Sequence, residues 1–393
     1  MKNAFSTRAV RAGIDSDTAF GAVAPPLILS ANFSFDGFGG KRRYDYSRSG
    51  NPTRDQLGDA LTSLEGGAGA VVTATGMAAV ALVLHTLLEP SDRLLVPHDC
   101  YGGSWRLFTA LAAKSAFELD SCDFTDTSAL SAAIDRKPNV VWIETPSNPL
   151  LRITDLAAVS ASAHAIGALV VADNTFLSPA LQRPIEHGAD IVVHSTTKYI
   201  NGHSDVVGGA AIAAQPGIHE QLGWWGNALG LTGSPFDSYL TLRGLRTLDA
   251  RLRLQQQNCA AIADLLANNR HVSAVHYPGL ASHPGHAIAA RQQDGFGAML
   301  SFDLGGEAAV RAFVEGLSCF TLAESLGGVE SLIAHPATMT HAAMSEEARE
   351  RAQIGPGLLR VSVGIEDLRD LSSDICAALE RVADCAKEAV DEC

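Results

Sequence analysis

The stretch that decides the fold is ADIVVHSTTKYINGHSDVVGG, residues 189–209. Its residues Ile191, Val192 and Val193 form a short β-branched run, which predicts a buried strand. His194, three hydroxyl-bearing residues (195–197) and then Lys198 follow this strand. An amine at the end of a buried strand lies in a partly dry cleft, where desolvation lowers its pKa and makes it nucleophilic. The alternative is a strand-end lysine whose amine reaches open water.

Strand and helix signals alternate on both sides of this stretch. Short apolar runs predict strands at residues 70–72, 93–96, 140–143 and 168–172, and helical patterns occupy residues 55–64 and 75–88. The alternation predicts an α/β fold with a doubly wound, mostly parallel sheet. Ligands bind such sheets beyond the carboxyl ends of the strands. The polar segments HDCYGG, ETPSNP and DNTF each follow a predicted strand, so they are candidates for a site.

The pattern divides the chain into three predicted parts. Residues 1–48 carry little helical periodicity and many turn residues, so they predict an extended arm that lies on another surface, such as a second subunit. Residues 49–248 form the predicted ligand-binding domain. Residues 249–393 are predicted to form a smaller α+β domain. It contains a long helix at 251–266 and strand candidates at 272–276, 298–303 and 358–363.

The composition limits the classes of function. The chain has 393 residues, of which 47% are apolar and 18% charged, and its net charge is −14. These values predict a globular protein without a nucleic-acid or membrane partner. The N-terminus lacks the apolar core of a signal peptide, and the seven cysteines are scattered, so we expect a cytoplasmic protein. The histidines of residues 276–286 have no acidic or cysteine partner nearby, so no metal site is expected.

Asp173 closes an apolar strand 25 residues before Lys198, which places both side chains at the same edge of the predicted sheet. A lysine amine can form a Schiff base with pyridoxal phosphate, and a carboxylate can pair with the ring nitrogen of that cofactor. The hydroxyls of Ser195 and Thr197 could then hold its phosphate. Alternatively, Asp173 caps the turn that follows the strand.

Other segments offer further groups for the same chemistry. Gly76 and Met77 open a predicted helix whose N–H groups would face a phosphate. Arg360 lies in an otherwise apolar strand, where a buried guanidinium needs an anion, either a substrate carboxylate or a structural Asp or Glu. Three side chains are candidates for stacking or for phosphate contacts: Tyr101, Tyr46 and Arg48.

Taken together, these segments resemble those of the pyridoxal-phosphate enzymes of cysteine and methionine metabolism, in the fold-type I group. The resemblance covers nearly the whole chain, in the order DYSRSGNPTR, ATGMAA, HDCYGG, ETPSNP, VVADNTF, HSTTKYINGHSDVVGG, FTLAESLGGVESL and LLRVSVGIED. Within the family, HDCYGGSWRLF and ARQQDGFGAMLSFDL read closest to the branch that performs γ-replacement. The resemblance implies pyridoxal 5'-phosphate as the cofactor.

The resemblance also implies a role for each site residue. Lys198 would bind the cofactor covalently, Asp173 would pair with the ring nitrogen, and Tyr101 would stack on the ring and help deprotonate the incoming amine. The other implied cofactor contacts are Gly76, Met77, Asn148, Ser195 and Thr197, with Tyr46 and Arg48 from a neighbouring subunit. The implied substrate contacts are Arg360, Ser325, Glu324, Asp45 and Asn148.

The implied reaction joins O-succinyl-L-homoserine, or another O-acylhomoserine, to L-cysteine and gives L-cystathionine and the free acid, in methionine biosynthesis by transsulfuration. The implied assembly is a homotetramer built from two tight dimers. One alternative is γ-elimination from cystathionine, which is favoured by Ser49, because some members of the γ-replacement branch have a second arginine there. Another is a binding protein without catalysis, which the complete set of Lys198, Asp173 and Arg360 disfavours.

Overall fold

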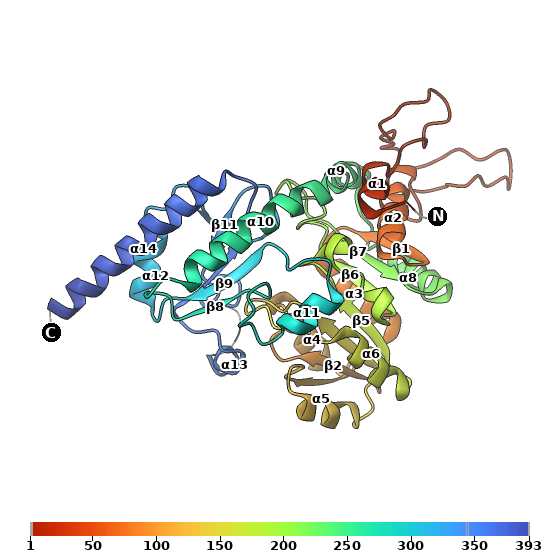
Figure 1. The fold of residues 1–393 in the computed structure, drawn as a ribbon. Coiled ribbons are helices and arrows are strands. Elements are labelled where there is room, and N and C mark those ends of the chain that lie inside the picture. Colours follow the sequence, from red (N-terminus) through yellow and green to blue (C-terminus); the bar gives the residue numbers. More distant parts are fainter. Residues whose placement is uncertain (1–2, 343, 345, 392–393) are drawn as a thin grey trace.

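The computed structural model describes residues 3–342, 344 and 346–391, and this part of the chain forms two sheets with helices packed on them (Figure 1). The larger sheet has the strand order β1-β7-β6-β5-β4-β2-β3, and the smaller one has the order β10-β11-β12-β9-β8. The loops of the N-terminal segment and the end of the last helix, α14 (Leu368–Asp391), lie at opposite ends of the molecule. Among the described residues, no helix has both the length and the apolar character needed to cross a bilayer.

The larger sheet is mostly parallel, as predicted. Its strands are β1 (Gly69–Thr73), β2 (Arg93–Pro97), β3 (Glu118–Cys122), β4 (Val140–Glu144), β5 (Leu169–Asp173), β6 (Ile191–His194) and β7 (Gly209–Ala213). Only β7 runs antiparallel to its neighbours, β1 and β6. The sequence predicted five of these strands and missed β3 and β7. The small residues of β7 and the polar residues of β3 carry a weak strand signal.

Helices cover both faces of this sheet. In β6, Ile191 and Val193 pack into the apolar core on one face, and Val192 packs into the core on the other face. The first core involves α3 (Gly76–Leu87), α4 (Gly102–Ala112) and α8 (Pro216–Leu229). The second involves α2 (Pro52–Glu65), α5 (Thr127–Ile134), α6 (Leu156–Ala165) and α9 (Pro235–Leu245). The predicted doubly wound architecture is therefore confirmed.

The smaller sheet has its own apolar core. Its strands are β8 (Ala274–His276), β9 (Met299–Asp303), β10 (Thr321–Leu322), β11 (Leu332–Ala334) and β12 (Leu358–Ser362). The helices of this part are α10 (Leu248–Ala267), α11 (His286–Gln292), α12 (Glu307–Val314), α13 (Glu346–Ala352) and α14. The long helix and the three strands predicted for this part are confirmed. The division into domains at residue 249 stays a prediction.

The N-terminal segment is extended, apart from the short helix α1 (Phe5–Val10). Phe20 and Phe38 in its loops are fully exposed. The segment is attached to the start of α2, where Ile28 N donates a hydrogen bond of 2.9 Å to Thr53 Oγ1 and Asn51 Nδ2 donates one of 3.1 Å to Ile28 O. That this arm contacts a second subunit stays a prediction.

Two glycines let the start of α3 lie directly beside the end of β6. A Cβ on Gly209 would lie 2.2 Å from Thr75 O, and a Cβ on Gly76 would lie 2.8 Å from Ser195 Cβ. No side chain fits in either space, so these positions require glycine. The hydroxyl of Thr75 caps α3 by accepting a hydrogen bond of 2.8 Å from Ala78 N. The start of α3 therefore lies against the loop that contains Ser195.

Candidate active site

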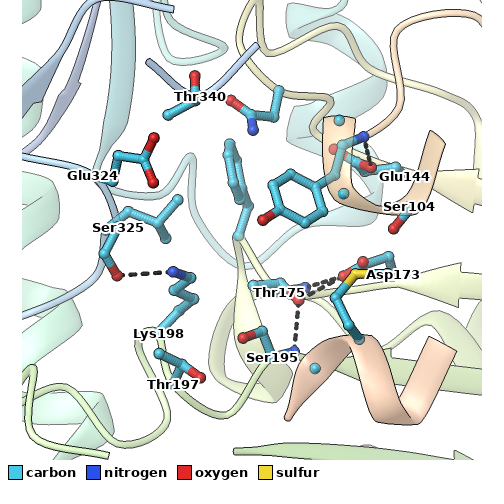
Figure 2. A pocket seen from close by; sticks show the side chains of 18 of the residues that line it. Ser104, Glu144, Asp173, Thr175, Ser195, Thr197, Lys198, Glu324, Ser325 and Thr340 are labelled. Carbon is cyan, nitrogen blue, oxygen red and sulfur yellow. Dashed lines mark hydrogen bonds between the residues drawn. The ribbon is translucent and has the colours of Figure 1, made fainter. Parts of the chain in front are cut away.

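A cavity of about 460 Å³ lies at the carboxyl ends of the central parallel strands (Figure 2). The register pairs Glu144, the last residue of β4, with Asp173, the last residue of β5, and pairs Asp173 with Val193 of β6. All three residues line the cavity. A cavity therefore lies at the edge of the sheet where the strand–helix alternation predicted a site.

Most of the predicted site residues line this cavity, and three do not. Those that line it are Gly76, Met77, Tyr101, Asn148, Asp173, Ser195, Thr197, Lys198, Glu324, Ser325 and Arg360. They come from both sheets, because Arg360 lies on β12 and Ser325 lies in the loop that follows β10. The residues outside the lining are Asp45, Tyr46 and Arg48.

Lys198 lies in the turn after β6, and its Nζ donates a hydrogen bond of 2.8 Å to Ser325 Oγ (Figure 2). Burial lowers the pKa of Lys198 to about 8, and the charge of Arg360 contributes in the same direction, whereas Glu324 opposes it. A minor fraction of the amine is therefore neutral near neutral pH, and this neutral form is the one that acts as a nucleophile or a base. The alternative of a lysine in open water is wrong.

Asp173 caps a turn and also lines the cavity, and its pairing with a ring nitrogen stays a prediction. Its Oδ1 accepts hydrogen bonds of 2.6 Å from Thr175 Oγ1 and 3.0 Å from Thr175 N, so it caps the turn after β5. It also lines the cavity. Burial raises the pKa of Asp173, and the two hydrogen bonds from Thr175 act against that rise. A cation placed beside this carboxylate would favour its charged form.

Arg360 is buried, with 3% of its surface exposed, and it binds neutral oxygens. Its Nη1 donates a hydrogen bond of 3.0 Å to Asn148 Oδ1, and its Nη2 donates one of 3.0 Å to Ser325 O. Its Nε has no hydrogen-bond partner, and no described Asp or Glu forms a salt bridge with it. The structural carboxylate expected as one alternative is therefore wrong for the described residues. Burial lowers the pKa of Arg360 to about 10, which shows how poorly the charge is compensated.

Ser325 is held between these two cations in a strained conformation. Its φ is +86°, in the left-handed region that residues other than glycine rarely adopt. Such a conformation costs about 1–3 kcal/mol and persists only where the surroundings determine it. Here Lys198 holds the side-chain oxygen and Arg360 holds the backbone oxygen.

Tyr101 precedes α4, and its backbone N donates a hydrogen bond of 2.7 Å to Glu144 Oε2. Burial, followed by the charge of Glu324, raises the pKa of the Tyr101 phenol, so its hydroxyl is protonated at neutral pH. Glu144 is itself buried, and burial followed by the charge of Asp173 raises its pKa well above the ordinary value. Sequence reasoning missed Glu144, although its place at the end of a predicted strand was the signal.

Other residues of the lining were missed too, among them Arg106, Thr175 and His341. Arg106 lies on α4, one turn and a half after Tyr101, and its spacing from Tyr101 was a possible signal. Thr175 follows Asp173 closely and could have been found in the same way. His341 lies in an irregular segment that offers no signal. Burial lowers its pKa to about 4, and the neutral ring donates from Nε2 to Asn148 O at 3.2 Å.

The three residues outside the cavity form contacts within the arm and with α8. Asp45 accepts hydrogen bonds from Lys41 Nζ at 2.8 Å and from Ser49 Oγ at 2.9 Å. Arg48 Nε donates 3.0 Å to Asn227 Oδ1, and its guanidinium lies 5.4 Å from the centre of the half-exposed Tyr46 ring. Their expected contact with a neighbouring subunit's site stays a prediction.

The chain is similar to known proteins over nearly its whole length. The model of the family described as Cys/Met metabolism PLP-dependent enzyme matches residues 6–380. A cystathionine γ-synthase of Escherichia coli (strain K12) is 55% identical over 371 residues, which are 94% of this chain and 96% of the relative. A cystathionine β-lyase of Lactococcus lactis subsp. cremoris (strain MG1363) is 44% identical, over 95% of this chain and 98% of the relative.

A solved structure is closer still to this chain. It is a cystathionine γ-synthase from Xanthomonas oryzae pv. oryzae in complex with cystathionine. Its sequence is 66% identical to this chain, and the two structures superpose with a TM-score of 0.97. The match covers 98% of this chain and 100% of the solved one.

The residues around the cavity fit pyridoxal phosphate. The start of α3 and the hydroxyl of Ser195 provide donors for a phosphate in a space that tolerates no Cβ at Gly76, whereas the Thr197 hydroxyl donates a hydrogen bond of 3.2 Å to Gly208 O. Asp173 provides a carboxylate for a ring nitrogen. Lys198 provides an amine with a lowered pKa in the same cavity.

The lowered pKa of Lys198 leads to a first prediction. In the cofactor-free protein, acylation of the Lys198 amine should rise with pH and reach half its maximum near pH 8, because only the neutral amine reacts. Arg360→Gln removes a neighbouring positive charge and should move this midpoint to higher pH. Glu324→Gln removes a negative charge and should move it to lower pH.

Competitive labelling with acetic anhydride, read by mass spectrometry, measures this midpoint. The exposed Lys114 serves as the internal standard for reagent concentration. Midpoints that move in the same direction in both variants would contradict the assignment of these charges to the Lys198 environment.

Proposed function

The chain belongs to the Cys/Met metabolism PLP-dependent enzyme family, and we propose that it catalyses a γ-replacement reaction. O-succinyl-L-homoserine, or another O-acylhomoserine, and L-cysteine give L-cystathionine and the free acid. This is the transsulfuration step of methionine biosynthesis. The similarity to relatives that bear the name cystathionine γ-synthase supports this proposal.

The observation that carries the proposal is the convergence of Lys198 and Arg360 on Ser325. The amine donates to Ser325 Oγ and the guanidinium to Ser325 O, so a substrate carboxylate bound by Arg360 would lie close to the amine. Arg360 Nε, which has no partner, is a donor for such a carboxylate. The substrate's Cα, which is bonded to that carboxylate, would then be within reach of Lys198 Nζ.

Each of these residues would have one kind of task in the reaction. It would bind a group, orient a group or move a proton. When bound, pyridoxal phosphate supplies an electron sink for the negative charge that develops on the substrate. Lys198 Nζ would remove the Cα proton and then transfer a proton at Cβ, for which a pKa of about 8 suits it. Asp173 would hold a proton at the ring nitrogen. Ser325 Oγ would orient the Lys198 amine between these steps.

The expected role of Tyr101 as a base depends on the cations around it. Burial raises the pKa of its phenol, and the charges of Arg106 and Arg360 lower it by smaller amounts. Tyr101 would stack on the ring as a protonated phenol. It would accept a proton from the substrate amine only where further positive charge lowers its pKa.

The bond changes balance without any further reactant. The Cγ–O bond of the donor breaks and its electron pair leaves with the carboxylate, which for the O-succinyl donor is succinate. The cysteine thiolate then forms the new S–Cγ bond. The protons taken from Cα and Cβ return to those atoms, so no oxidant or reductant is needed.

Arg106 is the residue we propose for the distal carboxylate of an O-succinyl donor. It lines the cavity on α4 and its guanidinium is exposed, whereas Ser49 offers no charge for this purpose. A succinyl group ends in a carboxylate, which an acetyl group lacks. A contact with Arg106 would therefore favour the succinyl donor.

Product analysis tests the proposed reaction directly. The purified holoenzyme is incubated with O-succinyl-L-homoserine, with and without L-cysteine. With cysteine we expect L-cystathionine and succinate in equal amounts. If the holoenzyme instead forms 2-oxobutanoate and ammonia from cystathionine and gives no cystathionine in the first reaction, γ-elimination is the activity.

Replacing Arg106 tests how the donor is held. Arg106→Met should raise the KM for O-succinyl-L-homoserine by about three- to tenfold, the size of a solvent-exposed ion pair. The KM for O-acetyl-L-homoserine should change less than twofold, because this donor has no distal carboxylate. Steady-state kinetics with both donors measure the difference. An equal rise for both would show that Arg106 binds a group the two donors share.

We also propose that Tyr46 and Arg48 complete the site of a neighbouring subunit, in a homotetramer built from two dimers. In the single chain they lie on an exposed arm and outside the cavity, so they are available to a neighbour. Asp45 would contribute to substrate binding from the same arm.

Complementation tests this arrangement. Arg48→Ala and Lys198→Ala chains should each be inactive alone, because each lacks one part of every site. Mixed and reassembled, they should recover roughly a quarter of wild-type activity, since random pairing puts half of the chains in hybrid dimers with one intact site each. No recovery, in a sample whose hybrids are confirmed by native mass spectrometry, would mean that each site comes from one chain.

A further inference from the structure

Thr175 connects two parts of the site through three hydrogen bonds. Its Oγ1 donates a hydrogen bond of 2.6 Å to Asp173 Oδ1, and its backbone N donates one of 3.0 Å to the same oxygen. Its Oγ1 also accepts a hydrogen bond of 2.9 Å from Ser195 N. Figure 2 shows Thr175 between Asp173 and Ser195 at the floor of the cavity.

The direction of these bonds is determined by chemistry. An ionised carboxylate only accepts, so the single hydroxyl proton of Thr175 must go to Asp173. The hydroxyl oxygen is then free to accept the Ser195 N–H. The bond to Asp173 has the short length typical of a hydroxyl on a charged acceptor.

The bridge takes the place of backbone pairing where the two strands end. The register of β5 and β6 pairs Asp173 with Val193, and Asn174 N adds one more bond of 3.0 Å to Val193 O. Beyond Asn174, the loop after β5 and the loop after β6 are joined by the hydrogen bond that Ser195 N donates to Thr175 Oγ1. One side chain therefore fixes the separation between the carboxylate of one loop and the backbone of the other.

We propose that Thr175 is a positioning residue. It would hold the carboxylate of Asp173, which is to pair with the cofactor's ring nitrogen, in line with the loop at Ser195, which is to bind the cofactor's phosphate. This inference rests on the proposed function, because it assigns the ring nitrogen to Asp173 and the phosphate to the Ser195 loop. Thr175 acts through these neighbours and takes no part in the chemistry itself. Valine has the shape of threonine but would leave Ser195 N–H without its partner and Asp173 without its strongest donor.

The chain offers a matched control at Ser331, which directly precedes β11 of the smaller sheet. The Ser331 hydroxyl donates a hydrogen bond of 2.8 Å to Glu366 Oε2 and accepts one of 2.8 Å from Gly364 N. The backbone N of Ser331 donates a hydrogen bond of 2.6 Å to Glu366 Oε1. This is the same set of bonds as at Thr175. Ser331 is fully buried and lies outside the cavity lining, so its loss removes equivalent contacts away from the site.

The experiment compares Thr175→Val, Thr175→Ser and Ser331→Ala with the wild type. Cofactor affinity is measured by titrating each cofactor-free protein with pyridoxal phosphate and following tryptophan fluorescence; melting temperature and kcat are also recorded. Thr175→Val should weaken cofactor binding and lower kcat, each by about tenfold, the size expected for losing a hydrogen bond to a charged group. Thr175→Ser should stay within about twofold of wild type, because it keeps the hydroxyl.

Ser331→Ala should lower the melting temperature as Thr175→Val does, while its cofactor affinity and kcat stay within about twofold of wild type. Equal losses in Ser331→Ala would show a general effect of stability and would overturn the proposal. So would a Thr175→Val protein with unchanged cofactor affinity and kcat.

A double-mutant cycle separates the two arms of the bridge. In an Asp173→Asn background, Thr175→Val should no longer change kcat by more than about twofold, because that effect passes through Asp173. The loss of cofactor affinity through Ser195 should remain. Full additivity in kcat would overturn the link to Asp173. The cofactor titration needs no substrate, so its outcome stands even if the wild-type enzyme forms no cystathionine, which would refute the proposed reaction alone.

Discussion

The register of the three central parallel strands is the constraint on which the whole site depends. Backbone pairing places Glu144 beside Asp173, and Asp173 beside Val193, at one edge of the sheet. A slip of one residue would turn each side chain to the opposite face. Apolar cores on both faces prevent such a slip, because Ile191 and Val193 fill one core while Val192 fills the other. The packing of the sheet thus determines where the charged groups emerge.

Those charged groups are buried with too few partners of opposite sign. Burial, followed by the charge of Arg360, lowers the pKa of Lys198, and burial, followed by the charge of Asp173, raises the pKa of Glu144. Each of the proposed ligand groups supplies a missing counter-charge: a carboxylate at Arg360, a protonated ring nitrogen at Asp173 and a phosphate at the start of α3. Binding would therefore relieve the unfavourable burial of these charges, and the Lys198 amine can remain reactive at neutral pH.

The site also requires the two sheets to keep their relative position. The larger sheet carries Lys198, while the smaller one carries Arg360. The buried Arg251 of α10 links the two parts next to the lysine. Its Nη2 donates hydrogen bonds of 2.8 Å to Tyr199 O and 2.9 Å to Gly244 O. The turn that holds the amine is thereby attached to the first helix of the smaller part, so Lys198 and Ser325 stay within hydrogen-bond distance.

The sequence by itself determined the strand–helix alternation and the edge of the sheet where the cavity lies, and it singled out Lys198, Asp173 and Arg360, which line that cavity. These features depend on residue type and on periodicity within one or two elements, which a reader of the chain can follow. Only the tertiary structure decided the strained conformation of Ser325 and the bridge made by Thr175. The reason is separation along the chain: Lys198 and Ser325 are 127 residues apart, and Arg360 and Asn148 are 212 apart. Such contacts arise from the packing of whole sheets and helices, which no local pattern encodes.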